Sequence, residues 1–174
     1  MNNQNKLFWD IYYKNTNDDI KKHSSFAKFV YDKYIKQINN QNVYLKICDV
    51  GSGNCRDALF FGETKNMCYA IDINGVLDQE HNNCKLIKDD AESVLKNYTL
   101  QTLFDIIYMR WCLHALPYNI SCNIFSYALN NLKSNGLICI EVRSINDTKL
   151  KNESTYNKDD GSYTLIIFGE VIVT

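Results

Sequence analysis

The sequence predicts an α/β fold, with a doubly wound, mainly parallel sheet that has helices on both faces. Strand-like apolar runs alternate with helix-like patterns from about residue 45 to 144. The first of these runs, Leu45–Val50, passes into a glycine turn that opens a helix, as is typical of such sheets. With 174 residues and 45% hydrophobic content, the chain is expected to form a single domain, residues 1–174, around one core.

Each element follows from a local pattern. Residues 1–40 combine an aromatic patch, Leu7–Tyr13, with an amphipathic helix over about 25–38 that Ser24 or Ser25 caps. Pro117 precedes the helix that begins near Tyr118, where a proline is well tolerated. The predicted strands lie near 45–50, 67–72, 84–88, 104–109 and 137–142. The helices between them lie near 56–63, 91–98 and 118–133.

Two strand ends point to a nucleoside ligand. Asp49, Gly51 and Gly53 form an acid and glycine turn, and Asp72 ends the next strand at the interval of about 20 residues expected for an acid that binds ribose hydroxyls. A dinucleotide fingerprint needs a third glycine at position 56, where this chain has Arg56. The pattern therefore favours an adenosine cofactor other than a nicotinamide or flavin dinucleotide.

These residues resemble the class I S-adenosylmethionine-dependent methyltransferases, which have a Rossmann-like fold. Asp49, Gly51 and Gly53 match the first motif of that family, and Cys55 stands where its third glycine usually lies. Four further segments match later motifs in the family's order: Asp72–Asn74, Lys88–Ala91, Phe104–Arg110 and Leu132–Glu141. The resemblance covers about residues 45–144, the cofactor-binding core, and implies S-adenosylmethionine as cofactor. The implied cofactor contacts are Asp49, Gly51, Gly53, Arg56, Asp72, Ile73, Asp90 and Ala91.

Some roles stay open at this stage. Asp89 is an alternative to Asp90 as the adenine contact, and either acid is also a candidate cap for the helix that begins near Ala91. The aromatic patch resembles a segment that some small-molecule methyltransferases fold over the cofactor, with Tyr12 as the preferred contact; an aromatic lid packed on the first helix is the alternative.

His114 and Arg110 are the candidate catalytic residues, because Arg110 ends the fourth strand and His114 lies just past it. A histidine suits general-base work, although structural packing is the favoured interpretation. Arg110 suits an anionic substrate or the cofactor carboxylate, with a helix-cap or ion-pair role as the alternative. Glu141 and Arg143, which close the fifth strand, face the same crevice or pair with each other.

The C-terminal part, residues 145–174, is short for this family. Residues 145–160 are polar and predict a loop, and Tyr163–Val173 predicts either one bulged strand or a tight hairpin. The closing strands of the sheet are therefore expected to be incomplete. An exposed apolar edge would then invite pairing with another chain, and the oligomeric state is open.

Composition excludes several classes of protein. The net charge of −1, with both signs interspersed, does not indicate nucleic-acid binding. No apolar run reaches the roughly 18 residues that span a bilayer, and Met1–Asn5 does not resemble a signal peptide, so no membrane partner and a cytoplasmic location are expected. The seven cysteines are scattered, which predicts reduced, packed thiols and no metal site. Cys55, near a helix start, is the one candidate for a stabilised thiolate.

We therefore expect a methyltransferase that acts on a small molecule, with a sugar hydroxyl as the favoured acceptor. The competing hypothesis is a noncatalytic relic or partner subunit that binds S-adenosylmethionine but lacks a complete acceptor site. A nicotinamide oxidoreductase is a third hypothesis, and Arg56 argues against it.

Overall fold

The computed structural model describes residues 22–77, 81–98, 100–144 and 146, together with three strands near the C-terminus. Its centre is a sheet of five parallel strands in the order β3-β2-β1-β4-β5. The strands are β1 (Lys46–Val50), β2 (Met67–Ile71), β3 (Cys84–Ile87), β4 (Phe104–Arg110) and β5 (Leu132–Glu141). The predicted fold class is confirmed.

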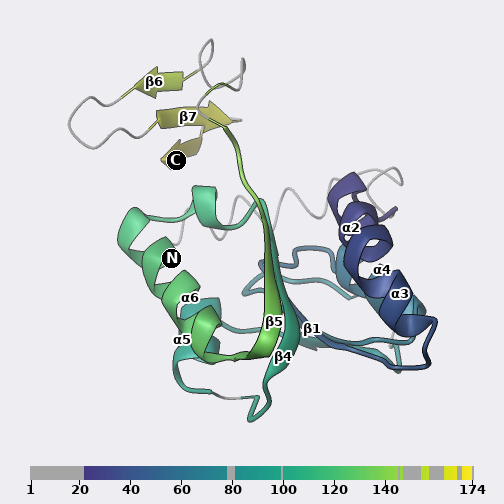
Figure 1. The fold of residues 1–174 in the computed structure, drawn as a ribbon. Helices are drawn as coiled ribbons and strands as arrows, with labels where there is room; N and C mark the ends of the chain where they lie inside the picture. The colour runs from purple at the N-terminus through teal and green to yellow at the C-terminus, as the bar shows by residue number, and fades with distance from the viewer. Residues whose placement is uncertain are drawn as a thin grey trace.

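Helices cover both faces of this sheet, as Figure 1 shows with the sheet seen nearly edge-on. On one face lie α4 (Arg56–Glu63) and an N-terminal helical stretch made of α2 (Ser25–Val30), the π-helical η2 (Tyr31–Ile35) and α3 (Lys36–Asn39). On the other face lie α5 (Ala91–Lys96) and α6 (Tyr118–Asn130). The predicted helix over about 25–38 is thus confirmed as one helical stretch with a π-helical centre.

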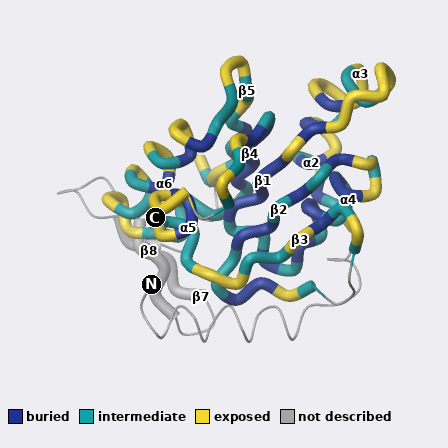
Figure 2. Tube along the Cα trace, turned by 90° about the horizontal axis from the view of Figure 1, so that it is seen from below, coloured by how far each residue is buried: buried dark blue, intermediate teal, exposed yellow. Residues whose placement is uncertain are grey.

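Alternate side chains of each strand pack against opposite helix layers, because successive strand residues point to opposite faces. On β4, Tyr108 joins the buried cluster that contains Val30 and Phe61, whereas Met109 joins the cluster that contains Leu95 and Ile124. The buried residues follow the middle of the sheet (Figure 2). The core is therefore two apolar layers separated by the sheet.

The strand order places a topological switch point at β1. The chain runs from β1 outward to β2 and β3, and then crosses to the other side of β1 to form β4. Ligands of open α/β sheets bind in the crevice that such a reversal leaves at the carboxyl ends of the strands. Asp49 lies there, paired in register with Ala70 of β2 and Tyr108 of β4.

The boundary between α6 and β5 differs from the prediction, which continued the helix to 133 and began the strand at 137. The helix ends at Asn130 because the side-chain amide of Asn131 donates to the carbonyl oxygens of Leu95 and Tyr127, at 2.8 Å each. The strand then begins at Leu132, and its pairing with β4 is irregular, since the register shifts between the pairs Phe104–Leu132 and Ile106–Leu137.

The C-terminal strands form a second sheet in the order β6-β7-β8. They are β6 (Ser154–Tyr156), β7 (Tyr163–Ile167) and β8 (Glu170–Val173), and both pairings are antiparallel. The hairpin alternative for Tyr163–Val173 is confirmed. The prediction of a loop over 145–160 is wrong at β6, which pairs with β7. The sequence of β6 is Ser-Thr-Tyr, and threonine and tyrosine favour strands.

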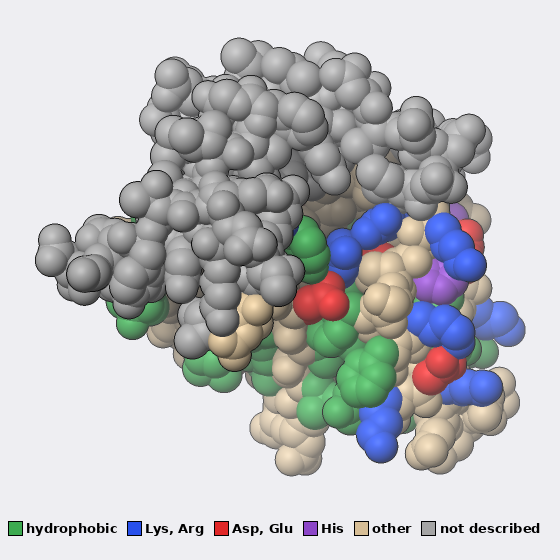
Figure 3. All heavy atoms as spheres, turned by 90° about the horizontal axis from the view of Figure 1, so that it is seen from above, with side chains coloured by type: hydrophobic (Ala, Val, Ile, Leu, Met, Phe, Trp, Pro, Cys, Tyr) green, Lys and Arg blue, Asp and Glu red, His purple; other side chains and the backbone are tan. Residues whose placement is uncertain are grey.

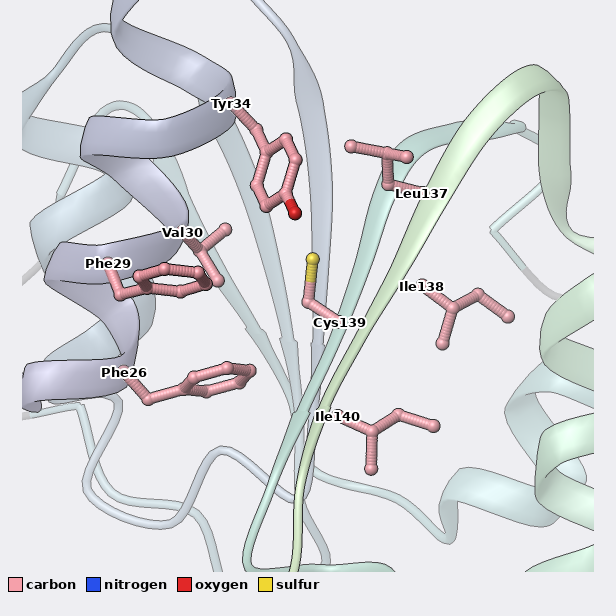
Figure 4. Close-up of a pocket in the computed structure, with 8 residues that line it drawn as sticks. All are labelled: Phe26, Phe29, Val30, Tyr34, Leu137, Ile138, Cys139 and Ile140. Atoms are coloured by element: carbon pink, nitrogen blue, oxygen red, sulfur yellow. The ribbon is translucent and has the colours of Figure 1, made fainter.

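In the described part of the chain, β5 pairs only with β4 and forms an edge of the parallel sheet. An apolar pocket lies beside this edge, where Phe26, Phe29 and Tyr34 face Leu137 and Cys139 (Figure 4). Pairing of this edge with another chain stays a prediction. No helix among the described residues is long and apolar enough to cross a membrane.

Candidate functional site

The turn between β1 and α4 has an alternating left-handed backbone. Gly51, Gly53 and Cys55 have φ angles of +75°, +55° and +59°. The amides of Gly51 and Ser52 donate to the carbonyl oxygen of Ile71, at 2.8 and 3.2 Å, which ties the turn to β2. Glycine adopts such angles without strain, whereas a residue with a Cβ does so at a free-energy cost.

Gly51 is also required by packing. A Cβ at this position would lie 2.7 Å from both Cβ and Sγ of Cys112, which follows β4. The group that approaches closely on the Cβ side of Gly51 is therefore the Cys112 side chain.

Cys55 occupies the third left-handed position, so the family's usual glycine there has a conformational reason. Its side chain is fully buried, and burial raises the pKa of the thiol to about 12. The thiol is therefore protonated at neutral pH, against the stabilised thiolate considered for it. All seven cysteines are free, and five of them are buried.

Asp72 joins the two strand-end loops. One carboxylate oxygen accepts from the amide of Gly53 at 2.9 Å, and the other accepts from the amide of Asn74 at 2.8 Å. Burial raises the pKa of Asp72, and these two backbone donors and Lys88 oppose the rise. Ile73 lies in the turn that follows, so the structure brings the predicted ribose acid and Ile73 beside the glycine turn.

Asp49 is only 2% exposed, at the end of β1. Burial raises its pKa well above the usual carboxyl range, and the negative charges of Asp57 and Asp72 add to the rise. A buried acid among other acids favours a cationic ligand, because a nearby positive charge stabilises its ionised form. The residues present therefore fit a positively charged adenosine cofactor.

The predicted adenine segment lies at the carboxyl end of β3. Asp90 caps α5, since its carboxylate accepts from the amide of Ser93 at 3.0 Å, and Asp89 accepts from the amide of Asp90 at 2.7 Å. The capping alternative is thus confirmed for Asp90. Ala91 is the first residue of that helix, and the adenine contact itself stays a prediction.

Arg110 belongs to an ion pair at the ends of β4 and β5. Its Nε lies 2.8 Å from Oε2 of Glu141, although the N–H does not point at that oxygen well enough for a hydrogen bond. The indole N–H of Trp111 donates to the same oxygen at 3.0 Å. The ion-pair alternative for Arg110 is therefore confirmed, and Glu141 has partners other than Arg143.

Trp111 is a residue that the sequence did not single out. It is 43% exposed, has a φ of +57°, and has the guanidinium carbons of Arg110 and Arg143 at 5.4 and 4.8 Å from its ring. A bulky side chain in the left-handed region is uncommon, and such strain is often found at functional sites.

Viewed from above the sheet, basic, acidic and apolar side chains lie interspersed on the described surface (Figure 3).

His114 lies on the 3₁₀ turn η3 (Leu113–Ala115), with its ring edge-on to Trp111 at 5.7 Å. Burial and the positive charge of Arg143 lower its pKa to about 4, and its buried Nδ1 has no hydrogen-bond partner among the described residues. The imidazole is therefore neutral at pH 7, with a ring nitrogen that no described residue engages.

A second buried acid, Asp57, was also missed from the sequence. It accepts hydrogen bonds from Ser24 and Tyr108, which are far away along the chain. Arg56, the first residue of α4, has its Nε 3.9 Å from Oδ1 of Asp57. Tyr12 and the aromatic patch lie outside the described residues, so their predicted contact with the cofactor stays a prediction.

No protein-family model matches this chain, and no curated protein matches it in sequence. Solved structures do match it. Over 97% of this chain, the structure is similar to the 1,6-didemethyltoxoflavin-N1-methyltransferase of Burkholderia thailandensis with bound 1,6-didemethyltoxoflavin and S-adenosylhomocysteine, with a TM-score of 0.63 and 13% identity. Over 90%, it is similar to the sugar N-methyltransferase KedS8 of Streptoalloteichus sp. ATCC 53650, with a TM-score of 0.59 and 12% identity.

A third similar structure is a SAM-dependent methyltransferase from Archaeoglobus fulgidus, with a TM-score of 0.52 and 17% identity over 68% of this chain. The chain spans 68, 62 and 54% of the lengths of these three proteins, in the order given. At these identities the likeness concerns the fold. The chain has the fold of S-adenosylmethionine-dependent methyltransferases of known structure.

Proposed function

We propose that this chain is an S-adenosylmethionine-dependent methyltransferase that acts on a small molecule, with a sugar hydroxyl as the favoured acceptor. The observation that supports it most is a pair of acids at the carboxyl ends of adjacent strands, Asp49 in β1 and Asp72 just after β2, around a left-handed glycine turn at the switch point of the sheet. A similar fold occurs in an N-methyltransferase crystallised with S-adenosylhomocysteine.

The acids at the ends of β1, β2 and β3 have distinct roles in this proposal. Asp72 presents a carboxylate already oriented by the amides of Gly53 and Asn74, which suits it to accept from ribose hydroxyls. The cationic end of the cofactor would favour the ionised form of the buried Asp49, whose pKa is raised in the free chain. Asp89 or Asp90, with Ala91, would contact the adenine at the end of β3.

S-adenosylmethionine supplies an electrophilic methyl group on a sulfonium, whose departure leaves a neutral thioether. The chain therefore has little charge to stabilise in the transition state, and its main task is to hold the acceptor in line. A hydroxyl acceptor must also lose a proton, so it needs a general base. His114 is neutral and has an unengaged Nδ1, as a base requires, although a pKa of about 4 makes it a weak one.

Arg110 has the ion-pair role in this proposal. Its ion pair with Glu141 neutralises part of its charge, and both groups contact Trp111. This arrangement favours a wall of the acceptor site, with the exposed indole ring as a surface for an apolar or planar part of the acceptor. Binding of a fully anionic substrate would require Arg110 to exchange its partner.

The test is methyl transfer measured as release of S-adenosylhomocysteine with a panel of sugars, thiols and amines. Turnover of a sugar, reduced in His114→Asn, would support the proposal. Methylation of amines or proteins alone would remove the sugar hydroxyl from it.

The second candidate is a noncatalytic S-adenosylmethionine-binding chain or a partner subunit. One observation favours it: among the described strands, β6, β7 and β8 form their own sheet and leave β5 as an edge of the parallel sheet. Cofactor binding without turnover, with activity restored by a second protein, would support this candidate over the enzyme.

A further inference from the structure

The buried carboxylate of Asp57 connects three elements that are distant in the sequence. Its Oδ1 accepts from the backbone amide of Ser24 at 2.6 Å, and its Oδ2 accepts from the Ser24 hydroxyl at 2.7 Å and from the Tyr108 hydroxyl at 2.8 Å. Ser24 caps α2, Tyr108 belongs to β4, and Asp57 lies in the first turn of α4. The Asp57 carboxylate is 5% exposed and accepts three hydrogen bonds. We call these three residues the Asp57 cluster.

Both donors are held in place by their own surroundings. The Ser24 hydroxyl also accepts from the amide of Ala27 at 3.0 Å, which fixes its orientation at the start of α2. The Tyr108 ring is fully buried and lies against Phe26 and Phe61, with ring centroids 5.2 and 5.3 Å away. Because neither donor can move freely, the cluster fixes the position of the first turn of α4.

That turn needs an external constraint. Cys55, the N-cap residue of α4, is left-handed, and its side chain makes no capping hydrogen bond. A non-glycine residue keeps this conformation only when the surrounding structure enforces it. The glycine turn is anchored at Gly53 by Asp72, and the next anchor along the chain is Asp57, so Cys55 lies between two fixed points.

We infer that Asp57 is a positioning residue for cofactor binding, and that its hydrogen bonds from Ser24 and Tyr108 keep the left-handed turn at Cys55 in the geometry that the cofactor requires. This inference rests on the proposed function. Asp57 acts through the backbone of the turn, and it needs no contact with the cofactor. Loss of a donor should therefore weaken cofactor binding, and a residue that adopts the left-handed turn freely should restore it.

The experiment measures S-adenosylmethionine affinity by calorimetry in the full chain. Tyr108→Phe removes one donor to Asp57 and keeps the ring, and we expect about tenfold weaker binding. Tyr69→Phe is the matched control, because Tyr69 lies on the neighbouring strand β2 with its ring against Phe104 at 5.5 Å, and it should change the affinity less than about twofold.

The double variant Cys55→Gly/Tyr108→Phe provides the readout that a purely structural role would not change. Glycine takes the left-handed angle without support. The affinity of the double variant for S-adenosylmethionine should therefore return to within about threefold of the wild-type value, even though the Tyr108 hydroxyl is still missing. Asp57→Asn gives a second test of the same cluster, with circular dichroism to confirm that each variant folds.

Two results would overturn the inference while leaving the proposed function intact. The first is a wild-type chain that binds S-adenosylmethionine and a Tyr108→Phe variant that binds it equally well. The second is weaker binding in Tyr108→Phe that Cys55→Gly does not restore. A folded wild-type chain that binds no S-adenosylmethionine would overturn both the proposed function and the inference.

Discussion

Replacing Gly51 with alanine tests the geometry of the turn at its most constrained point. The φ of +75° costs a residue with a Cβ about 1–2 kcal/mol. The new Cβ would also lie 2.7 Å from both Cβ and Sγ of Cys112, and overpacking of this kind costs about 1–3 kcal/mol. The Cys112 thiol can rotate away but its Cβ cannot, so we expect a loss of about 2–5 kcal/mol in the free energy of unfolding.

Urea unfolding of Gly51→Ala measures this loss, and a double-mutant cycle with Cys112→Gly separates its two parts. Cys112→Gly removes both close atoms, so in that background Gly51→Ala should retain only the backbone cost of about 1–2 kcal/mol. A total loss below about 1 kcal/mol, or the same loss in both backgrounds, would refute the reasoning.

Three further results are expected. Asp72→Asn should weaken S-adenosylmethionine binding at least about tenfold in calorimetry, because it removes the charge that strengthens hydrogen bonds from ribose; unchanged affinity would exclude that role. Because the pKa of Asp49 is raised, the folded chain holds a proton that the unfolded chain releases above about pH 4. The free energy of unfolding of the protein should therefore fall as the pH rises from about 4 through the raised pKa. Asp49→Asn should flatten that decline in urea unfolding at several pH values, and an equal decline in both proteins would show that Asp49 is not its source. His114 has a pKa of about 4, so a sugar-methylating activity that uses it as base should be flat from about pH 5 to 8 and fall near pH 4, and a loss of activity near pH 6.5 would contradict this assignment.

The elements next to the glycine turn were predictable because their signals are local. The alternation of apolar residues and the acid and glycine spacing placed β1, β2 and α4 to within a residue or so. Asp49 and Asp72 were found for the same reason, since the carboxyl ends of parallel strands meet at one edge.

The features that were missed depend on contacts between distant residues. Asp57 is 33 residues from Ser24 and 51 from Tyr108, and no periodic pattern reports such a cluster. The early start of β5 depends on the side chain of Asn131, which reaches the carbonyl oxygen of Leu95. The left-handed angle of Trp111 had no sequence signal, because bulky residues rarely adopt it.

The central claim is that the edge formed by Asp49, Asp72 and the glycine turn binds S-adenosylmethionine. Its most direct test is a calorimetric titration of the purified chain with S-adenosylmethionine, beside Asp72→Ala and with NAD as a control ligand. We expect micromolar binding of S-adenosylmethionine at one site, loss of that binding in Asp72→Ala, and no binding of NAD. A folded chain that binds NAD, or that binds no S-adenosylmethionine, would contradict it.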